Sequence, residues 1–130
     1  MSIIKAFNSH FIEFLDDVLN VFPHDKNVKT SRYYISGVMK INPSIVIKAW
    51  YQYCVMPYSK QIEKGDWSFF MEKDYKKDIG KSDQYNSEKV LGAIELIRNK
   101  ASDMSPEDQK KIVKYLQNLS KLSIMYKAQV

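Results

Sequence analysis

Apolar residues recur at steps of three and four along most of this chain, the spacing that one face of an amphipathic α-helix requires. Ser2 can cap the first such helix, and Pro23 ends it because a proline pushes the preceding residue out of the α conformation. The apolar stripe of this helix is wide and comprises Ile4, Phe7, Phe11, Phe14, Leu15, Val18 and Phe22. We therefore predict an N-terminal helix that buries this stripe.

Two further helices are predicted before the middle of the chain. The second covers 28–41, with Asn27 as its N-cap. The third follows Asn42 and Pro43, which match an N-cap and a first helical position. Residues 45–56 are apolar on most of the helix circumference, so the third helix is expected to be central.

Pro57 interrupts this third helix. A proline inside a helix lacks one backbone donor and clashes with the carbonyl four residues earlier, here that of Tyr53. We predict a kink or a short break at Pro57 and a resumed helix over 58–64. Gly65 is expected to stop that helix.

The second half of the chain adds three helices and a loop. Asp66 matches the N-cap of a short helix over 67–73, which is too short and apolar to stand alone and must dock. A mobile loop is predicted near 75–86, and a helix opens at 86–88 and closes at 102–104. The last helix starts at Ser105 and Pro106. Its apolar set comprises Ile112, Val113, Tyr115, Leu116, Leu119, Leu122, Met125 and Tyr126.

No segment alternates apolar and polar residues with the period of two that a half-buried strand shows. The chain is therefore predicted to be all-α, a single-domain bundle of five to six helices with short connections over residues 1–130. The residues expected to be largely buried are Phe7, Phe11, Phe14, Ile47, Trp50, Cys54, Ile94, Leu116 and Leu119.

Composition limits the compartment and the partners. The chain has 130 residues, of which 45% are apolar, and its one cysteine excludes a disulfide framework. No signal peptide or membrane-spanning run is visible, so we expect an intracellular protein that is not secreted and has no membrane partner. The net charge is +5, and lysine supplies nearly all of the positive charge. AT-rich codon usage explains such a lysine surplus as well as binding does.

Residues with catalytic or metal-binding chemistry are sparse. His10 and His24 lack the paired spacing of a zinc-binding helix, and the isolated glycines form no phosphate-binding loop. Cys54 lies among apolar residues, where burial makes a thiol inert. We therefore predict that the protein is not an enzyme, with no catalytic residues, no metal and no cofactor.

An acidic face on the first helix offers the best metal candidate. Glu13, Asp16, Asp17 and Asn20 share this face at helical spacing, opposite the apolar stripe. Such a cluster could hold a divalent cation, but its position favours a solvated face instead.

Two surfaces are candidates for binding another macromolecule. The first combines Trp67, Phe69 and Phe70 with the kink at Pro57, because aromatic side chains dominate protein-binding hot spots. Alternatively, these three aromatics close one end of the core. The second is a basic face that contacts phosphates without reading bases. Its residues are Lys29, Lys40, Lys48, Lys110, Lys111 and Lys114. We favour a protein partner, with non-sequence-specific nucleic-acid binding as the alternative function.

Four strings give the chain a resemblance to known proteins. They are KAFNSHFIEF at 5–14, NP at 42–43 followed by AWY at 49–51, DWSFF at 66–70 with KDY at 73–75, and KYLQNL at 114–119. With them the chain resembles a group of small all-helical proteins of nucleocytoplasmic large DNA viruses. The resemblance implies a viral source and a location in the host cytoplasm, the viral factory or the virion. It supplies no catalytic residues.

Overall fold

The computed structural model describes residues 2–66, 70 and 87–129. Over those ranges the chain forms helices and turns with no β-strand, which confirms the all-α prediction. The elements are α1 (Ile3–Val21), α2 (Lys26–Ile41), α3 (Ile45–Trp50), a π-helical segment (Tyr51–Val55), a 3-10 turn (Met56–Tyr58), α4 (Ser59–Glu63), α7 (Ser87–Ser102) and α8 (Pro106–Gln129). The helix predicted over 67–73, apart from Phe70, and the loop predicted near 75–86 lie outside the described residues.

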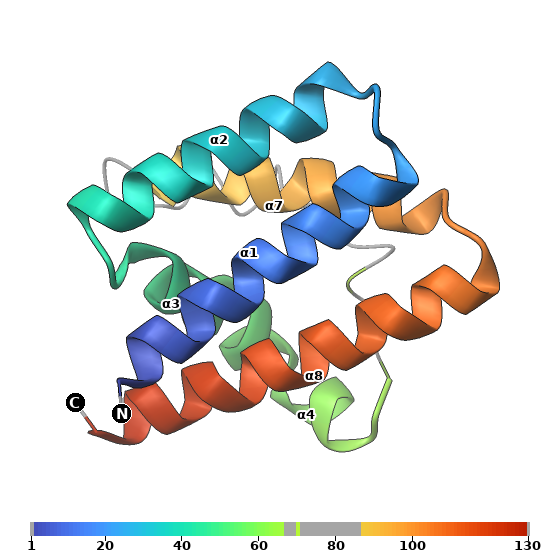
Figure 1. Cartoon of the computed structure of the whole chain (residues 1–130). Coiled ribbons are helices and arrows are strands. Elements are labelled where there is room, and N and C mark those ends of the chain that lie inside the picture. The colour runs from blue at the N-terminus through green and yellow to red at the C-terminus, as the bar shows by residue number, and fades with distance from the viewer. Residues whose placement is uncertain (1, 67–69, 71–86, 130) are drawn as a thin grey trace.

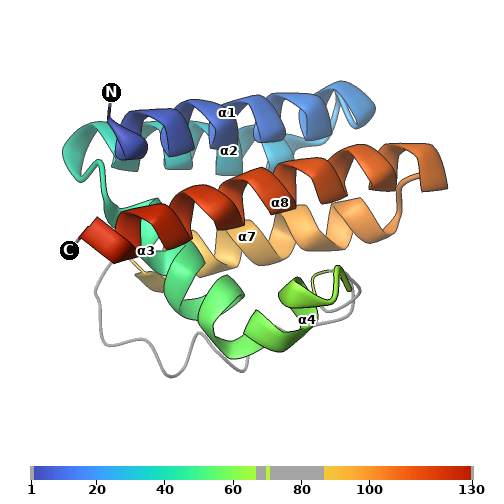
Figure 2. The same ribbon diagram turned by 90° about the horizontal axis from the view of Figure 1, so that it is seen from below.

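The four long helices of the described residues, α1, α2, α7 and α8, form a ring in which every neighbouring pair is antiparallel (Figure 1). Helix α1 packs against α2 and α8, and α7 closes the ring by packing against the same two helices. Viewed from below, α1 and α2 form one layer and α8 and α7 form the other (Figure 2). Helices α2 and α8 therefore lie diagonally across the bundle, and their solvent-facing sides point away from each other.

Helix α3 crosses the bundle and contacts all four helices of the ring, as its largely apolar circumference predicted. Its last residue, Trp50, is 1% exposed and lies against the rings of Phe7 and Phe11. The Trp50 indole N–H donates to the Ser120 hydroxyl at 3.1 Å, so burying this nitrogen leaves no donor unpaired. All nine residues predicted to be buried are so, with at most 1% of each exposed.

The helix starts were predicted less well than the helix interiors. Ser2 caps α1 as expected, and its hydroxyl accepts from the Lys5 amide at 3.2 Å. The cap of α2 is Asp25 and not Asn27, because the Asp25 carboxylate accepts from two amides at the helix start. Helix α2 therefore begins at Lys26.

The predicted start of the third helix at Asn42 and Pro43 is also wrong. Asn42 belongs to the end of α2, where its N–H donates to the Val38 carbonyl at 2.8 Å. The chain then needs two more residues to turn, and α3 begins after Ser44. The start of α8 is as predicted, since the Ser105 hydroxyl accepts from the Asp108 amide at 3.2 Å.

The interruption predicted at Pro57 is present. The helix widens to a π-helical turn in which the Met56 N–H donates to the Tyr51 carbonyl, and it then tightens to a 3-10 turn around the proline. The path of the chain changes direction between α3 and α4 (Figure 2). Gly65 ends α4 with a φ of 74°, and the Gly65 and Asp66 amides donate back to Ile62 and Gln61, the pattern of a Schellman cap.

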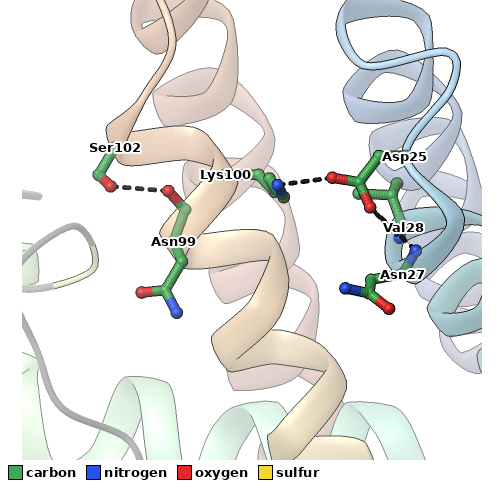
Figure 3. Close-up of polar contacts among 6 residues, drawn as sticks. All are labelled: Asp25, Asn27, Val28, Asn99, Lys100 and Ser102. Atoms are coloured by element: carbon green, nitrogen blue, oxygen red, sulfur yellow. Dashed lines mark hydrogen bonds and ion pairs between the residues drawn. The ribbon is translucent and has the colours of Figure 1, made fainter.

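An ion pair ties the start of α2 to the end of α7 (Figure 3). The Lys100 ammonium lies 2.5 Å from the Asp25 carboxylate that caps α2, and 5.5 Å from the centre of the Phe22 ring. The hydrogen bond from Lys100 is the largest cause that holds the pKa of Asp25 below its ordinary 3.8, followed by the Val28 amide. This contact fixes the α1–α2 turn to α7.

Candidate functional site

The predicted aromatic surface is only partly described, and one of its members is in the core. Phe70 is 1% exposed, and its ring centre lies 6.0 Å from that of Trp50. Its predicted role in partner binding is therefore wrong, because burial against Trp50 leaves almost no surface to offer. Trp67 and Phe69 lie outside the described residues.

The predicted lysines do not share one face. Lys29 and Lys40 lie on α2, Lys48 lies on α3, and Lys110, Lys111 and Lys114 lie on α8. All six side chains are exposed. Helices α2 and α8 lie diagonally across the ring (Figure 1), so the exposed lysines of the two helices lie on opposite sides of the bundle. The single basic face that the alternative function needs is therefore split into separate surfaces.

Each carboxylate on the acidic face of α1 has a partner of its own. Asp17 accepts a short hydrogen bond from the Tyr115 hydroxyl of α8, and Asp16 accepts from the Arg32 guanidinium of α2 at 2.8 Å. A Glu13 carboxylate oxygen lies 3.5 Å from His10 Nδ1. No cluster of three ligand side chains suited to a metal ion occurs among residues 2–66, 70 and 87–129. The acidic face thus links α1 to its two neighbours.

Tyr115 is the centre of the seam between α1 and α8. Its ring stacks on Phe14 with centres 5.4 Å apart and lies 4.8 Å from the His10 ring. Burial is the largest cause that raises the pKa of the Tyr115 phenol, and the hydrogen bond to Asp17 raises it further. The phenol is therefore held in its neutral form as the donor in this seam.

The seam opens into a groove towards the C-terminal end of α8. This α1–α8 groove has a volume of about 410 Å³ and is lined by Ala6, His10, Asn118, Lys121, Leu122 and Met125. The Nε2 atom of His10 is buried beneath it with no hydrogen-bond partner in the described part of the chain.

A second groove runs along the other side of α8. This α4–α8 groove has a volume of about 320 Å³ and is lined by Ile62, Gly65, Gln117, Ser120, Lys121, Ile124 and Met125. Lys121 and Met125 line both grooves, so they form the ridge between them. Ile124 and Met125 are 46% and 45% exposed, which places two large apolar side chains in contact with solvent beside these hollows.

We call the solvent-facing stripe of α8 its outer face, defined by Lys110, Lys114, Gln117, Lys121, Ile124 and Met125. These positions follow one another at helical steps of one, three and four. From Gln109 to Gln129 the helix carries five lysines and no Asp or Glu. The outer face therefore joins a basic stripe to an apolar end.

The prediction missed this face because it assigned Met125 to the apolar set that faces the core. The sequence did contain a sign of this face. Ile124, Met125 and Tyr126 are consecutive apolar residues, and three in a row cover more of the helix circumference than one buried stripe needs. Such excess width on a helix marks an apolar side chain that has to stay in solvent or meet a partner.

Among the described residues, Cys54 is buried as predicted. None of the described helices has the length and hydrophobicity that crossing a membrane demands. Comparison with known proteins finds no matching family model, no matching curated protein and no matching solved structure. The resemblance to helical viral proteins therefore stays a prediction.

Proposed function

We propose that the protein acts by binding another protein through the outer face of α8. The observation that carries the proposal is the exposure of Ile124 and Met125 between two grooves. Burying the exposed half of each side chain would contribute about 1 kcal/mol, so the pair accounts for about a 30-fold change in Kd. Grooves beside such side chains let a partner contact them from several sides.

The charge of the face supports an acidic partner. The last 21 residues of α8, Gln109 to Gln129, carry five lysines and no carboxylate to balance them. The nearby α1 carboxylates are engaged by Tyr115, Arg32 and His10. Lys121 lines both grooves, so a carboxylate of the partner can meet an ammonium at the ridge.

The same charge argues against a second copy of this chain as the partner. A symmetric contact between two outer faces would bring three lysines from each copy into one interface, with no carboxylate on either face to offset them. Like charges placed across an interface disfavour association. A different protein with exposed carboxylates fits the face better.

The test compares paired surface variants in capture experiments. Ile124→Glu with Met125→Glu should weaken binding at least about 30-fold, because it removes the apolar contacts and adds charge that repels an acidic partner. The matched control carries Tyr33→Glu with Ile41→Glu, two exposed apolar positions on α2. The immobilised variants are exposed to nuclease-treated extract of cells that express the protein, and bound proteins are quantified by mass spectrometry. Capture that is equal for both variants would contradict the proposal.

The acidity of the partner is tested separately. A carbodiimide couples a lysine amine to a carboxylate only when the two are close enough to form an ion pair, and the amide forms with loss of water. Cross-links are expected from Lys121 to Asp or Glu of the captured partner. Lys114→Glu with Lys121→Glu should abolish them, whereas Lys29→Glu with Lys40→Glu should leave them unchanged. If the variant with Lys114→Glu and Lys121→Glu still captures the partner, the apolar contacts act without the charges.

A further inference from the structure

The outer face of α2 presents a second surface, different from that of α8. Its residues follow one another at steps of one, three and four, and every one of them is exposed: Lys26, Lys29, Thr30, Tyr33, Gly37, Lys40 and Ile41. Tyr33 lies in the middle of this face with 83% of its surface exposed. An exposed aromatic ring between lysines is a feature that the packing of the bundle does not need.

The lysines of this face are not neutralised. Helix α2 contains four basic residues and no Asp or Glu. Its Arg32 is paired with Asp16, and the carboxylate at the helix start, Asp25, is taken by Lys100 and two amides. In the described part of the chain neither Lys29 nor Lys40 forms an ion pair. Both ammonium groups are therefore available to an external anion.

The spacing of the Lys29 and Lys40 ammonium groups fits a nucleic-acid strand better than a single phosphate. Lys29 and Lys40 are separated by about 16 Å along the helix axis, since an α-helix rises about 1.5 Å per residue. At the stacked spacing of about 3.4 Å per nucleotide, that distance corresponds to about four to five nucleotides. Tyr33 lies between the two lysines. Next to it on this face, a Cβ added at Gly37 would meet nothing within 4 Å beyond the neighbouring backbone of its own helix. The outer face of α2 is thus unobstructed at Gly37, where a nucleic-acid strand would pass.

We propose that the outer face of α2 binds single-stranded nucleic acid, with a base stacked on Tyr33 and phosphates on Lys29 and Lys40. Stacking on an aromatic side chain is independent of sequence because every base has a flat π face. In a duplex the base faces are already covered by neighbouring base pairs, so Tyr33 has nothing to stack on. A lipid surface fits less well, since only Tyr33 and Ile41 on this face carry large apolar surface.

Fluorescence anisotropy with a labelled oligothymidylate of about 15 nucleotides tests the proposal. Tyr33→Ala should weaken binding roughly 5-fold to 150-fold, the range found when a stacked aromatic is removed. Tyr33→Phe keeps the ring and should stay within about twofold of the wild type. Lys29→Gln with Lys40→Gln should lower the slope of log affinity against log salt by about 1.4, because each lost contact with a single strand contributes about 0.7.

Controls separate this surface from that of α8. Lys110→Gln with Lys114→Gln, and Ile124→Glu with Met125→Glu, should both leave oligonucleotide binding unchanged. A duplex of the same length should bind more weakly than the single strand. No binding at about 50 mM salt, equal loss in the Ala and Phe variants of Tyr33, or a preference for the duplex would overturn the proposal. Binding to phosphatidylserine vesicles with no binding to the oligonucleotide would overturn it as well.

Discussion

Helices α8 and α2 lie diagonally across the same ring, and their outer faces have similar charge but different shape. Neither face carries an acid: α2 has none, and α8 has none from Gln109 onward. The outer face of α8 is bordered by two grooves and ends in two half-exposed apolar residues. The outer face of α2 has a single, almost fully exposed tyrosine. From their charge alone, both helices would be assigned the same role. The grooves and apolar residues of α8 and the exposed tyrosine of α2 indicate different partners.

The two helices are also held in place differently. Helix α8 packs along α1, and the Tyr115–Asp17 hydrogen bond lies within that seam. Helix α2 is fixed at its start, where Asp25 caps the helix and pairs with Lys100, and further along by the Arg32–Asp16 ion pair with α1. Three pairs of measurements on α8 and α2 follow from this contrast, and they are given in order of decreasing effect.

Truncation of a buried side chain should destabilise the protein equally on the inner faces of α8 and α2. Leu116→Ala in α8 and Ile35→Ala in α2 each delete a fully buried side chain, since both residues are 0% exposed. We expect each to lower the free energy of unfolding by roughly 2–5 kcal/mol through lost burial and a residual cavity. Urea denaturation followed by circular dichroism measures this. A loss below about 1 kcal/mol for only one of the two would show that one helix is loosely packed.

The polar contact of α8 should have a smaller effect that depends on alkaline pH. Tyr115→Phe keeps the ring against Phe14 and removes the hydroxyl that donates to Asp17. We expect a loss of about 1 kcal/mol at neutral pH, less than for a buried charged pair because the contact is half-exposed.

The sign of the pH dependence follows from the raised pKa of Tyr115. A raised pKa means that folding favours the neutral phenol, so its contribution is complete below the ordinary pKa of 10.0 and is lost as the pH rises above it. The stability difference between the wild type and Tyr115→Phe should therefore shrink at alkaline pH. A difference that is constant up to strongly alkaline pH would contradict the hydrogen bond.

The polar contact of α2 should respond to acid instead. Asp25→Asn retains a side chain that can cap the helix and removes the charge that pairs with Lys100. Because the pKa of Asp25 is lowered, its contribution is complete above the ordinary 3.8 and is lost as the pH falls below it. Melting temperatures of the wild type and the variant should differ at neutral pH and converge in acid. Curves that run parallel down to strong acid would contradict the pairing.

The outer faces should matter least for stability. Ile124→Ser in α8 and Ile41→Ser in α2 replace side chains that are 46% and 85% exposed. We expect both variants to stay within about 0.5 kcal/mol of the wild type. The same denaturation measurement decides this, and a large loss for Ile124→Ser would mean that the residue packs against the bundle and is not available to a partner.

The core was predictable because burial follows the helical period. Phe7, Trp50 and Leu116 all lie on stripes that only a helix explains, and the residues of each stripe are close in sequence. The helix starts were less predictable, since Asp25 and Asn27 are both good N-caps. What favours Asp25 is the additional pairing with Lys100, which lies far along the chain.

The candidate sites were predicted only in part. The lysines were identified, but their distribution over two diagonal helices depends on how the ring closes, which no local pattern encodes. The bond between Tyr115 and Asp17 joins residues at opposite ends of the sequence. Met125 lines grooves that α8 forms with α1 on one side and with α4 on the other, so its exposure depends on the packing of three separate helices.

The wide turn and the tight turn around Pro57 have opposite effects on the rotation of the helix. The π-helical turn at Tyr51–Val55 takes up more residues per turn than an α-helix and delays the rotation, while the 3-10 turn at Met56–Tyr58 takes up fewer and advances it. The two departures largely cancel. Tyr51 and Ile62 are about three helical turns apart and span both segments, and both pack partly against the core, as they would in an unbroken helix. The proline therefore changes the course of the helix and preserves its phase, which is why Ile62 still faces α8 and lines a groove with Ile124.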